Sequence, residues 1–194
     1  MKQLDLILAS TSRYRRELLQ RLGIPFRCLT PLIDEDSFKT ARLDPVSLAA
    51  TLAIAKAESL SRFDPESVVI GSDQVAALDD EILNKPGSIE NAIEQLVRMS
   101  GRTHRLITAV AVAHQCRTRL HVNVTELTMR PLTRNAVERY VISEHPLDCA
   151  GSYMIESQGI ALFESIQTSD QTAIIGLPLM AIVSLLGRCG ITLP

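Results

Sequence analysis

The sequence has no long hydrophobic run and no large excess of charge, and these two absences exclude several classes of protein. No stretch reaches the roughly 18 apolar residues that a membrane-spanning helix requires. The formal net charge of the 194 residues is −2, which argues against binding to nucleic acid or an acidic membrane surface through bulk charge. The first residues hold one lysine and a short apolar run, too little for a secretory signal peptide.

The sequence motifs of common metal, redox and nucleotide sites are also missing. The four cysteines lie far apart without C-x-x-C spacing, and the four histidines show no metal-ligand spacing, so a local zinc motif is not expected. Neither a G-x-x-x-x-G-K-[ST] loop nor a G-x-S-x-G or G-x-G-x-x-G motif occurs. Dispersed cysteines without such spacing fit a reducing cytoplasm. The cysteines are Cys28, Cys116, Cys149 and Cys189, and the histidines are His104, His114, His121 and His145.

The N-terminal stretch combines an apolar strand with a basic helix start. Leu6–Ala9 predicts a buried strand, and after a run of hydroxyl residues Arg13–Leu22 predicts a helix that ends at Gly23. Three arginines crowd the first turn, where the helix dipole favours anions, so they strengthen a positive site that suits phosphate. At about 100° per residue, Arg15 falls within the apolar face and is expected to point inward. The alternative is an arginine that snorkels or pairs with a core carboxylate.

Two further ionisable residues occupy unusual positions. Lys56 lies near the centre of the apolar face of a helix predicted from the N-cap Asp44 to about Ser61. It must snorkel, or meet a buried carboxylate or a ligand phosphate. Asp73 follows the buried strand Val68–Ile70 and a glycine, and a carboxylate at such a strand end is well placed for chemistry. An Asx turn is the alternative interpretation of Asp73.

The rest of the chain predicts an α/β fold. The acidic segment Asp34-Glu35-Asp36 is expected in a solvated loop, and Lys85 precedes a proline on a rigid bend. Helices are predicted over 88–99, 133–144 and 179–186, and strands over 25–29, 105–116, 120–129 and 160–163, with a hairpin turn at 79–80.

Taken together, these side chains match the needs of phosphoryl chemistry. Cations neutralise a polyphosphate, hydroxyls bind its oxygens, and carboxylates supply the oxygen ligands that a divalent metal prefers. By themselves the residue types predict only a site for a nucleotide or a phosphate ester. The set comprises Arg15, Lys56 and Lys85, the hydroxyls of Ser10 and Ser12, and the carboxylates of Glu35 and Asp73.

Short motifs in order along nearly the whole chain carry a family resemblance. They are Leu6–Phe26, Asp34-Glu35, Ala55-Lys56-Ala57, Gly71-Ser72-Asp73-Gln74, Lys85-Pro86, Ser100–His104, Ala150–Tyr153 and Gly176-Leu177-Pro178. Each motif is weak alone, whereas their order and spacing are specific. The sequence resembles the Maf family of nucleotide pyrophosphatases.

The resemblance implies both a fold and a reaction. The fold is α/β, with a long, curved mixed sheet, flanking helices and two lobes around a cleft, in one domain over 1–194. The reaction is hydrolysis of a nucleoside triphosphate to the monophosphate and pyrophosphate with a divalent cation, Mg²⁺ or Mn²⁺. Asp73 matches the residue that accepts the proton. Glu35 matches a carboxylate that binds the metal, and Asp73 is expected to bind the metal as well. The phosphate-binding positions match Ser10, Ser12, Arg15, Lys56 and Lys85.

Three positions resemble the YceF subgroup of the family, which acts on 7-methyl-GTP. Members that act on dTTP or UTP have a basic residue at the position of Tyr14. They have Thr at the position of Gln74 and Gln at the position of Glu156. A methylated guanine carries positive charge, which an aromatic face attracts by about 0.5–2 kcal/mol. A carboxylate can accept from the guanine N1–H and N2–H. Packing at the helix start is the alternative role of Tyr14.

Several functional alternatives stay open on the sequence. They are a pyrophosphatase for dTTP or UTP, a nucleotide-binding regulator of cell division, and a phosphate-ester hydrolase that releases orthophosphate. The expected partner is a small nucleotide in the cytoplasm, with neither nucleic acid nor membrane, and the resemblance makes a homodimer plausible.

Overall fold

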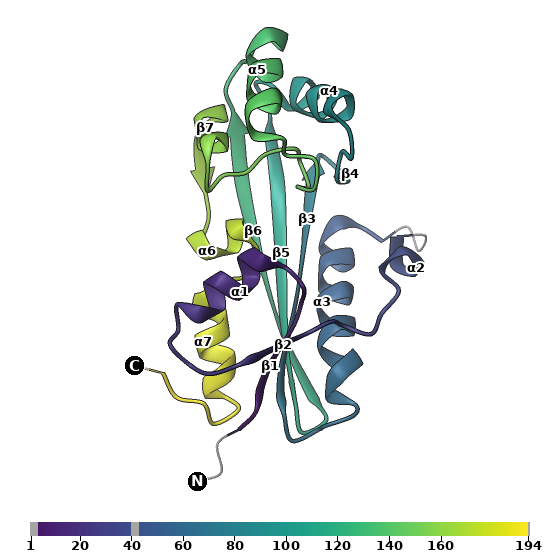
Figure 1. The fold of residues 1–194 in the computed structure, drawn as a ribbon, viewed down its shortest axis with the longest axis vertical. Coiled ribbons are helices and arrows are strands. Elements are labelled where there is room, and N and C mark those ends of the chain that lie inside the picture. Colours follow the sequence, from purple (N-terminus) through teal and green to yellow (C-terminus); the bar gives the residue numbers. More distant parts are fainter. Residues whose placement is uncertain (1–3, 40–42, 194) are drawn as a thin grey trace. The chain divides into compact units, whose positions relative to one another are not determined.

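The computed structural model describes residues 4–39 and 43–193 as an α/β protein with one mixed sheet (Figure 1). The strands are β1 (Leu6–Ala9), β2 (Arg27–Leu29), β3 (Val68–Leu78), β4 (Glu81–Leu83), β5 (Thr103–His114), β6 (Arg117–Met129) and β7 (Phe163–Gln167). The helices are α1 (Arg13–Gln20), α2 (Glu35–Lys39), α3 (Pro45–Ser61), α4 (Ile89–Met99), α5 (Arg134–Glu144), the 3₁₀ helix η1 (Gln158–Leu162), α6 (Gln171–Ile175) and α7 (Leu179–Gly187). In these described ranges, no helix has both the length and the apolar character that crossing a membrane requires.

The sheet is mixed, as the family resemblance implies. Its hydrogen-bonded order is β2-β1-β3-β5-β6-β7, and β4 pairs with β3. Strand β1 is parallel to both β2 and β3, whereas β4 is antiparallel to β3 and β7 is antiparallel to β6. The α/β fold class with flanking helices is therefore confirmed.

The chain divides into two compact units. Unit 1 comprises residues 1–74, 108–123 and 170–194, and unit 2 comprises 75–107 and 124–169. Strands β3, β5 and β6 contribute residues to both units. A single domain over 1–194 and a cleft between two lobes stay predictions.

Unit 1 is built on β1 and the first part of β3. Leu8 and Ile70 are fully buried in an apolar core with Leu19 of α1 and Ile182 of α7. Because neighbouring residues of a strand face opposite sides of the sheet, the residues next to Leu8 and Ile70 face α3 instead. The backbone of α3 lies so close to β3 there that position 71 has no room for a side chain and is a glycine.

Unit 2 contains the remaining strand segments, α4, α5 and an aromatic cluster. Helices α4 and α5 pack against each other. His104 on β5 is 1% exposed and lies against the rings of Tyr153 and Phe163. His104 Nε2 and the Tyr153 hydroxyl are 2.9 Å apart, at hydrogen-bond distance.

Helix starts are the best predicted features. The Asp44 carboxylate accepts from the backbone N–H groups of residues 46 and 47 at the start of α3. Ser88 and Thr133 cap α4 and α5 in the same way. Helix α1 ends at Gln20, two residues earlier than predicted, and Gly23 has φ +67°. These caps satisfy otherwise unpaired N–H groups.

Three sequence predictions are wrong at the level of elements. Glu35 lies in the short helix α2, not in an irregular loop. Asp73 lies within β3, which runs unbroken from Val68 to Leu78, not at a strand end. Residues 158–162 form η1 and the strand begins only at Phe163. Helix α6, capped by Asp170, was not predicted.

Candidate active site

Lys56 lies between two carboxylates in unit 1. Its Nζ atom is 2.6 Å from Asp73 Oδ1 and 2.9 Å from Glu35 Oε1. The side chains of Lys56 and Asp73 are 6% and 11% exposed, whereas that of Glu35 is 46% exposed. Of the alternatives for Lys56, the structure shows the buried carboxylate. The two carboxylates compensate for the hydration that a lysine loses on burial.

The position of Asp73 follows from the close approach of β3 and α3. Gly71 and Asp73 are two residues apart on β3, so both face α3. A Cβ atom at Gly71 would lie 2.5 Å from the Ala57 backbone nitrogen and closer still to the Ala53 carbonyl oxygen. Because position 71 has no side chain, α3 packs directly on the strand. The same turn of α3, between Ala53 and Ala57, brings Lys56 to Asp73.

The hydroxyl turn between β1 and α1 forms the second part of the site. Ser10 Oγ accepts from the Ser12 N–H at 3.1 Å, and Ser12 Oγ, the N-cap of α1, accepts from the Arg15 N–H at 3.4 Å. Ala9 of β1 is in register with Gly71 of β3. Ser10 therefore leaves the sheet beside the segment that carries Asp73.

Arg15 points inward, as its place on the helix predicts. Its Nε donates to the Gly176 carbonyl oxygen at 3.0 Å. Burial lowers the pKa of the Arg15 guanidinium, while the charges of Asp73 and Glu35 act in the opposite direction. Both carboxylates are thus close enough to stabilise the Arg15 cation. The neighbouring Arg13 instead forms an exposed ion pair with Glu17.

A hydrogen-bond network around α6 fixes the other face of β3, and sequence reasoning did not identify it. Gln74 Nε2 donates to Thr108 Oγ1 at 2.9 Å and lies 2.9 and 3.0 Å from the carbonyl oxygens of Ala173 and Ile174. Ser72 Oγ lies 3.0 Å from the Gly176 oxygen that also accepts from Arg15. Only the Gly176-Leu177-Pro178 motif pointed to this segment. Gln74 and Arg15 are therefore both held by backbone carbonyl oxygens of the segment from Ala173 to Gly176.

Glu35 and Asp73 are the donors available for a divalent metal. Within residues 4–39 and 43–193, no group of three or more His, Cys, Asp or Glu side chains could hold a metal ion. Two carboxylates are nevertheless enough for Mg²⁺, which keeps several waters and takes its other ligands from substrate phosphates. The Lys56 ammonium already lies between these carboxylates, which shows that the position accommodates a cation. The donor set therefore fits a metal that enters with a nucleotide.

The predicted site residues divide between the two units. Ser10, Ser12, Tyr14, Arg15, Glu35, Lys56, Asp73 and Gln74 belong to unit 1, whereas Lys85 and Glu156 belong to unit 2. Tyr14 is 38% exposed at the start of α1. Lys85 and Glu156 are both exposed.

Within unit 2, Lys85 and Glu156 lie on neighbouring segments. The Gly87 N–H, just after Lys85, donates to the Leu147 carbonyl oxygen at 3.1 Å. Burial raises the pKa of the Cys149 thiol, Glu156 raises it further, and Lys85 lowers it. Cys149 is therefore close to both charges. The catalytic, phosphate, metal and specificity roles of all these residues stay predictions.

Comparison with known proteins supports a single family. The family model described as "Maf-like protein" matches residues 5–189. A 7-methyl-GTP pyrophosphatase of Bordetella pertussis is 49% identical over 186 residues, which cover 96% of this chain and 92% of that protein. The proteins of the same name from Bdellovibrio bacteriovorus and Pseudomonas putida are 46% and 44% identical, covering 96% and 98% of this chain and 97% and 100% of theirs. The chain therefore belongs to the Maf family.

Proposed function

We propose that this protein is a nucleoside triphosphate pyrophosphatase that hydrolyses 7-methyl-GTP to 7-methyl-GMP and pyrophosphate. The observation that carries the proposal is the buried Lys56–Asp73 pair, with Glu35 on the same ammonium and Arg15 within electrostatic reach. A buried carboxylate next to cations suits a base that acts on water beside a polyphosphate. The reaction belongs to the hydrolysis of phosphorus-containing anhydrides.

The cations of unit 1 hold the triphosphate. Lys56 has three N–H donors, and its two carboxylate partners leave one for a phosphate oxygen. Arg15 and the hydroxyl turn at Ser10 and Ser12 offer further donors, aided by the N-terminus of α1. Lys85 of unit 2 is assigned a further phosphate contact.

Asp73 accepts a proton from the water that attacks the α-phosphorus, and pyrophosphate leaves. Because the charged groups are already in position before the reaction starts, they stabilise the charge that develops on the phosphate oxygens. A divalent cation, Mg²⁺ or Mn²⁺, bound through Glu35 and Asp73 would neutralise phosphate charge and polarise the phosphoryl group. Clearing a modified nucleotide fits this chemistry.

Specificity for the methylated guanine is assigned to Tyr14, Gln74 and Glu156. The Tyr14 ring is partly exposed, so it can stack on a cationic base. The Gln74 amide nitrogen is engaged by α6 and Thr108, so its amide oxygen is the atom assigned to the base. The Glu156 carboxylate accepts from the guanine N1–H and N2–H. The relatives named 7-methyl-GTP pyrophosphatase support this choice.

A product assay tests the proposal. The enzyme is incubated with Mg²⁺ or Mn²⁺ and 7-methyl-GTP, GTP, dTTP or UTP, and pyrophosphate is resolved from orthophosphate. We expect pyrophosphate from 7-methyl-GTP, and none when the metal is chelated. A preference for dTTP or UTP would keep the reaction and reject the specificity. Orthophosphate release would indicate a different hydrolase, and no turnover would favour a nucleotide-binding regulator.

The cellular setting completes the proposal. The protein acts on free nucleotides in the cytoplasm, without nucleic acid or membrane partners, as a homodimer. Sedimentation of the purified chain tests the homodimer, and a monomer would reject it without affecting the reaction.

A further inference from the structure

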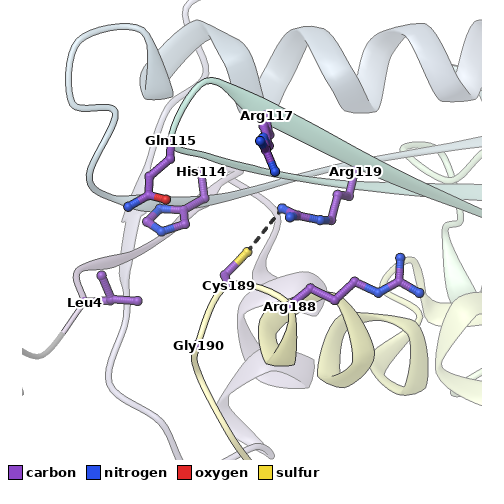
Figure 2. A pocket seen from close by; sticks show the side chains of 8 residues that line it. All are labelled: Leu4, His114, Gln115, Arg117, Arg119, Arg188, Cys189 and Gly190. Carbon is purple, nitrogen blue, oxygen red and sulfur yellow. Dashed lines mark hydrogen bonds between the residues drawn. The ribbon is translucent and has the colours of Figure 1, made fainter.

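A pocket lies in unit 1 that is formed by residues the candidate active site does not use. It has a volume of about 440 Å³ and is lined by Arg117 and Arg119 of β6, Arg188 and Cys189 after α7, and His114 at the end of β5. Figure 2 shows Arg117 and Arg119 on the strand that faces Cys189. Pockets of about 300–1,000 Å³ are typical of small-molecule sites.

Among the residues that the structure describes, no anion forms an ion pair with the three arginines of this pocket. The described residues that line the pocket include no Asp or Glu, and none of the described carboxylates lies within ion-pair distance of Arg117, Arg119 or Arg188. The polar contact of Arg119 is with Cys189, whose Sγ lies 3.9 Å from Arg119 Nη1. Burial raises the pKa of the Cys189 thiol, so at neutral pH the thiol does not cancel the arginine charge.

The pocket is built partly from buried groups. His114 is 8% exposed, and its Nδ1 lies 3.4 Å from the Ser67 carbonyl oxygen. Because a carbonyl only accepts, Nδ1 carries the proton in this contact. Its Nε2 atom makes no hydrogen bond to the part of the chain that the structure describes. Cys189 is likewise 8% exposed.

The pocket is separate from the candidate active site. Thr108, which binds Gln74, and His114 lie on the same strand β5, six positions apart, or about 20 Å at 3.3 Å per residue. Leu4, just before β1, also lines the pocket, whereas Ser10 follows the other end of that strand. A ligand here would not overlap the nucleotide.

We propose that this arginine pocket, defined by His114, Arg117, Arg119, Arg188 and Cys189, binds a small phosphorylated anion. Guanidinium groups match phosphate oxygens with paired N–H donors. Several arginines around one cavity favour a ligand with more than one anionic oxygen group, such as inorganic pyrophosphate or the phosphate of a nucleotide. Neither the reaction nor the specificity proposed above requires this site.

The test counts bound pyrophosphate by equilibrium dialysis with radiolabelled inorganic pyrophosphate. We expect Arg119→Gln/Arg188→Gln to bind one pyrophosphate fewer per chain than the unmodified protein, or at least about tenfold more weakly at that site, since a charge-assisted hydrogen bond is worth roughly 1.5–3 kcal/mol. Arg21→Gln/Arg139→Gln removes the same charge from exposed positions and should bind as the unmodified protein does. Equal binding by both double variants overturns the proposal.

A local measurement on the unmodified protein covers the case in which the double variant does not fold. Alkylation of Cys189 is followed by peptide mass spectrometry, with exposed Cys28 as internal reference. We expect inorganic pyrophosphate, inorganic phosphate or GMP to slow alkylation of Cys189 and not of Cys28. Stronger protection by GMP would identify a nucleotide as the ligand, and stronger protection by pyrophosphate an inorganic anion. No protection, or equal protection by citrate, rejects a phosphate site, and neither result depends on turnover.

Discussion

At the scale of single residues, Asp73 and Lys56 are chemically dependent on each other. Each is almost fully buried, and the 2.6 Å contact between them supplies what hydration would supply in water. Removing one partner of such a pair leaves an uncompensated buried charge, which commonly costs about 3–5 kcal/mol. Glu35 reduces this cost at Lys56, because it shares the ammonium. A change at Asp73 is therefore more informative about catalysis than one at Lys56.

We predict that Asp73→Asn lowers kcat for pyrophosphate release by about 10²–10⁴-fold, which is the usual contribution of a general base. Lys56 would keep Glu35 as a partner, so the protein should still fold and bind the nucleotide. Steady-state kinetics and equilibrium binding of 7-methyl-GTP measure the two effects separately. Asp44→Asn is the matched control, since asparagine also caps helices and Asp44 only caps α3. An Asp73→Asn enzyme with unchanged kcat would contradict the assigned role.

At the scale of elements, the contact between β3 and α3 determines whether the site exists. Gly71 is the closest point, and alanines 53 and 57 on α3 are fully buried there. The N-cap at Asp44 fixes where α3 begins, and the glycine fixes how close it lies. Lys56 reaches Asp73 only because both conditions are met.

We predict that Gly71→Ala destabilises the protein by at least about 2 kcal/mol and lowers activity. Its new Cβ would meet backbone atoms of Ala53 and Ala57, which cannot rotate away, and overpacking of a core costs about 1–3 kcal/mol. Urea unfolding and the product assay measure the two effects. In contrast, Gly187→Ala in α7 has no heavy atom within 4 Å of the new Cβ. It should be neutral or stabilise by up to about 1 kcal/mol, and an equal loss in both variants would contradict the close-approach argument.

The sequence predicted local features of the fold and of the site far better than the distant ones. Helix caps such as Asp44 and Ser88 were predictable because a cap involves only the next few residues. The inward direction of Arg15 followed from helical spacing. The unbroken β3 was missed because Gly71 normally weakens a strand, and here its role is to admit α3.

The hydrogen-bond network around α6 could not be predicted, because its contacts join residues that are 99 to 161 positions apart in the sequence. Gln74 meets the carbonyl oxygens of Ala173 and Ile174, and Arg15 meets that of Gly176. A backbone carbonyl leaves no trace in residue type, and α6 has only five residues. Propensity is weak over so short a segment.

At the scale of the whole molecule, the stability of the folded state should depend on pH through His104. Burial lowers the pKa of His104 to about 4, from an ordinary value of 6.5. The unfolded chain therefore binds more protons between these values, and the free energy of unfolding falls as pH falls. The stabilisation is complete above pH 6.5 and is lost through pH 4. The loss from pH 7.5 to 5.0 is about 2 kcal/mol.

His104→Gln removes this titration, and its amide can still form a hydrogen bond with the Tyr153 hydroxyl. The drop in unfolding free energy between pH 7.5 and 5.0 should therefore be about 2 kcal/mol smaller in this variant than in the unmodified protein. The chain has no tryptophan, and two of its three tyrosines, Tyr140 and Tyr153, are buried in unit 2. Tyrosine fluorescence during urea unfolding therefore reports on the unit that contains His104. His121→Gln makes the same change at an exposed position and should retain the full pH dependence. If the His104 variant showed the same pH dependence of its unfolding free energy as the unmodified protein, the burial of His104 would not be the cause of that dependence.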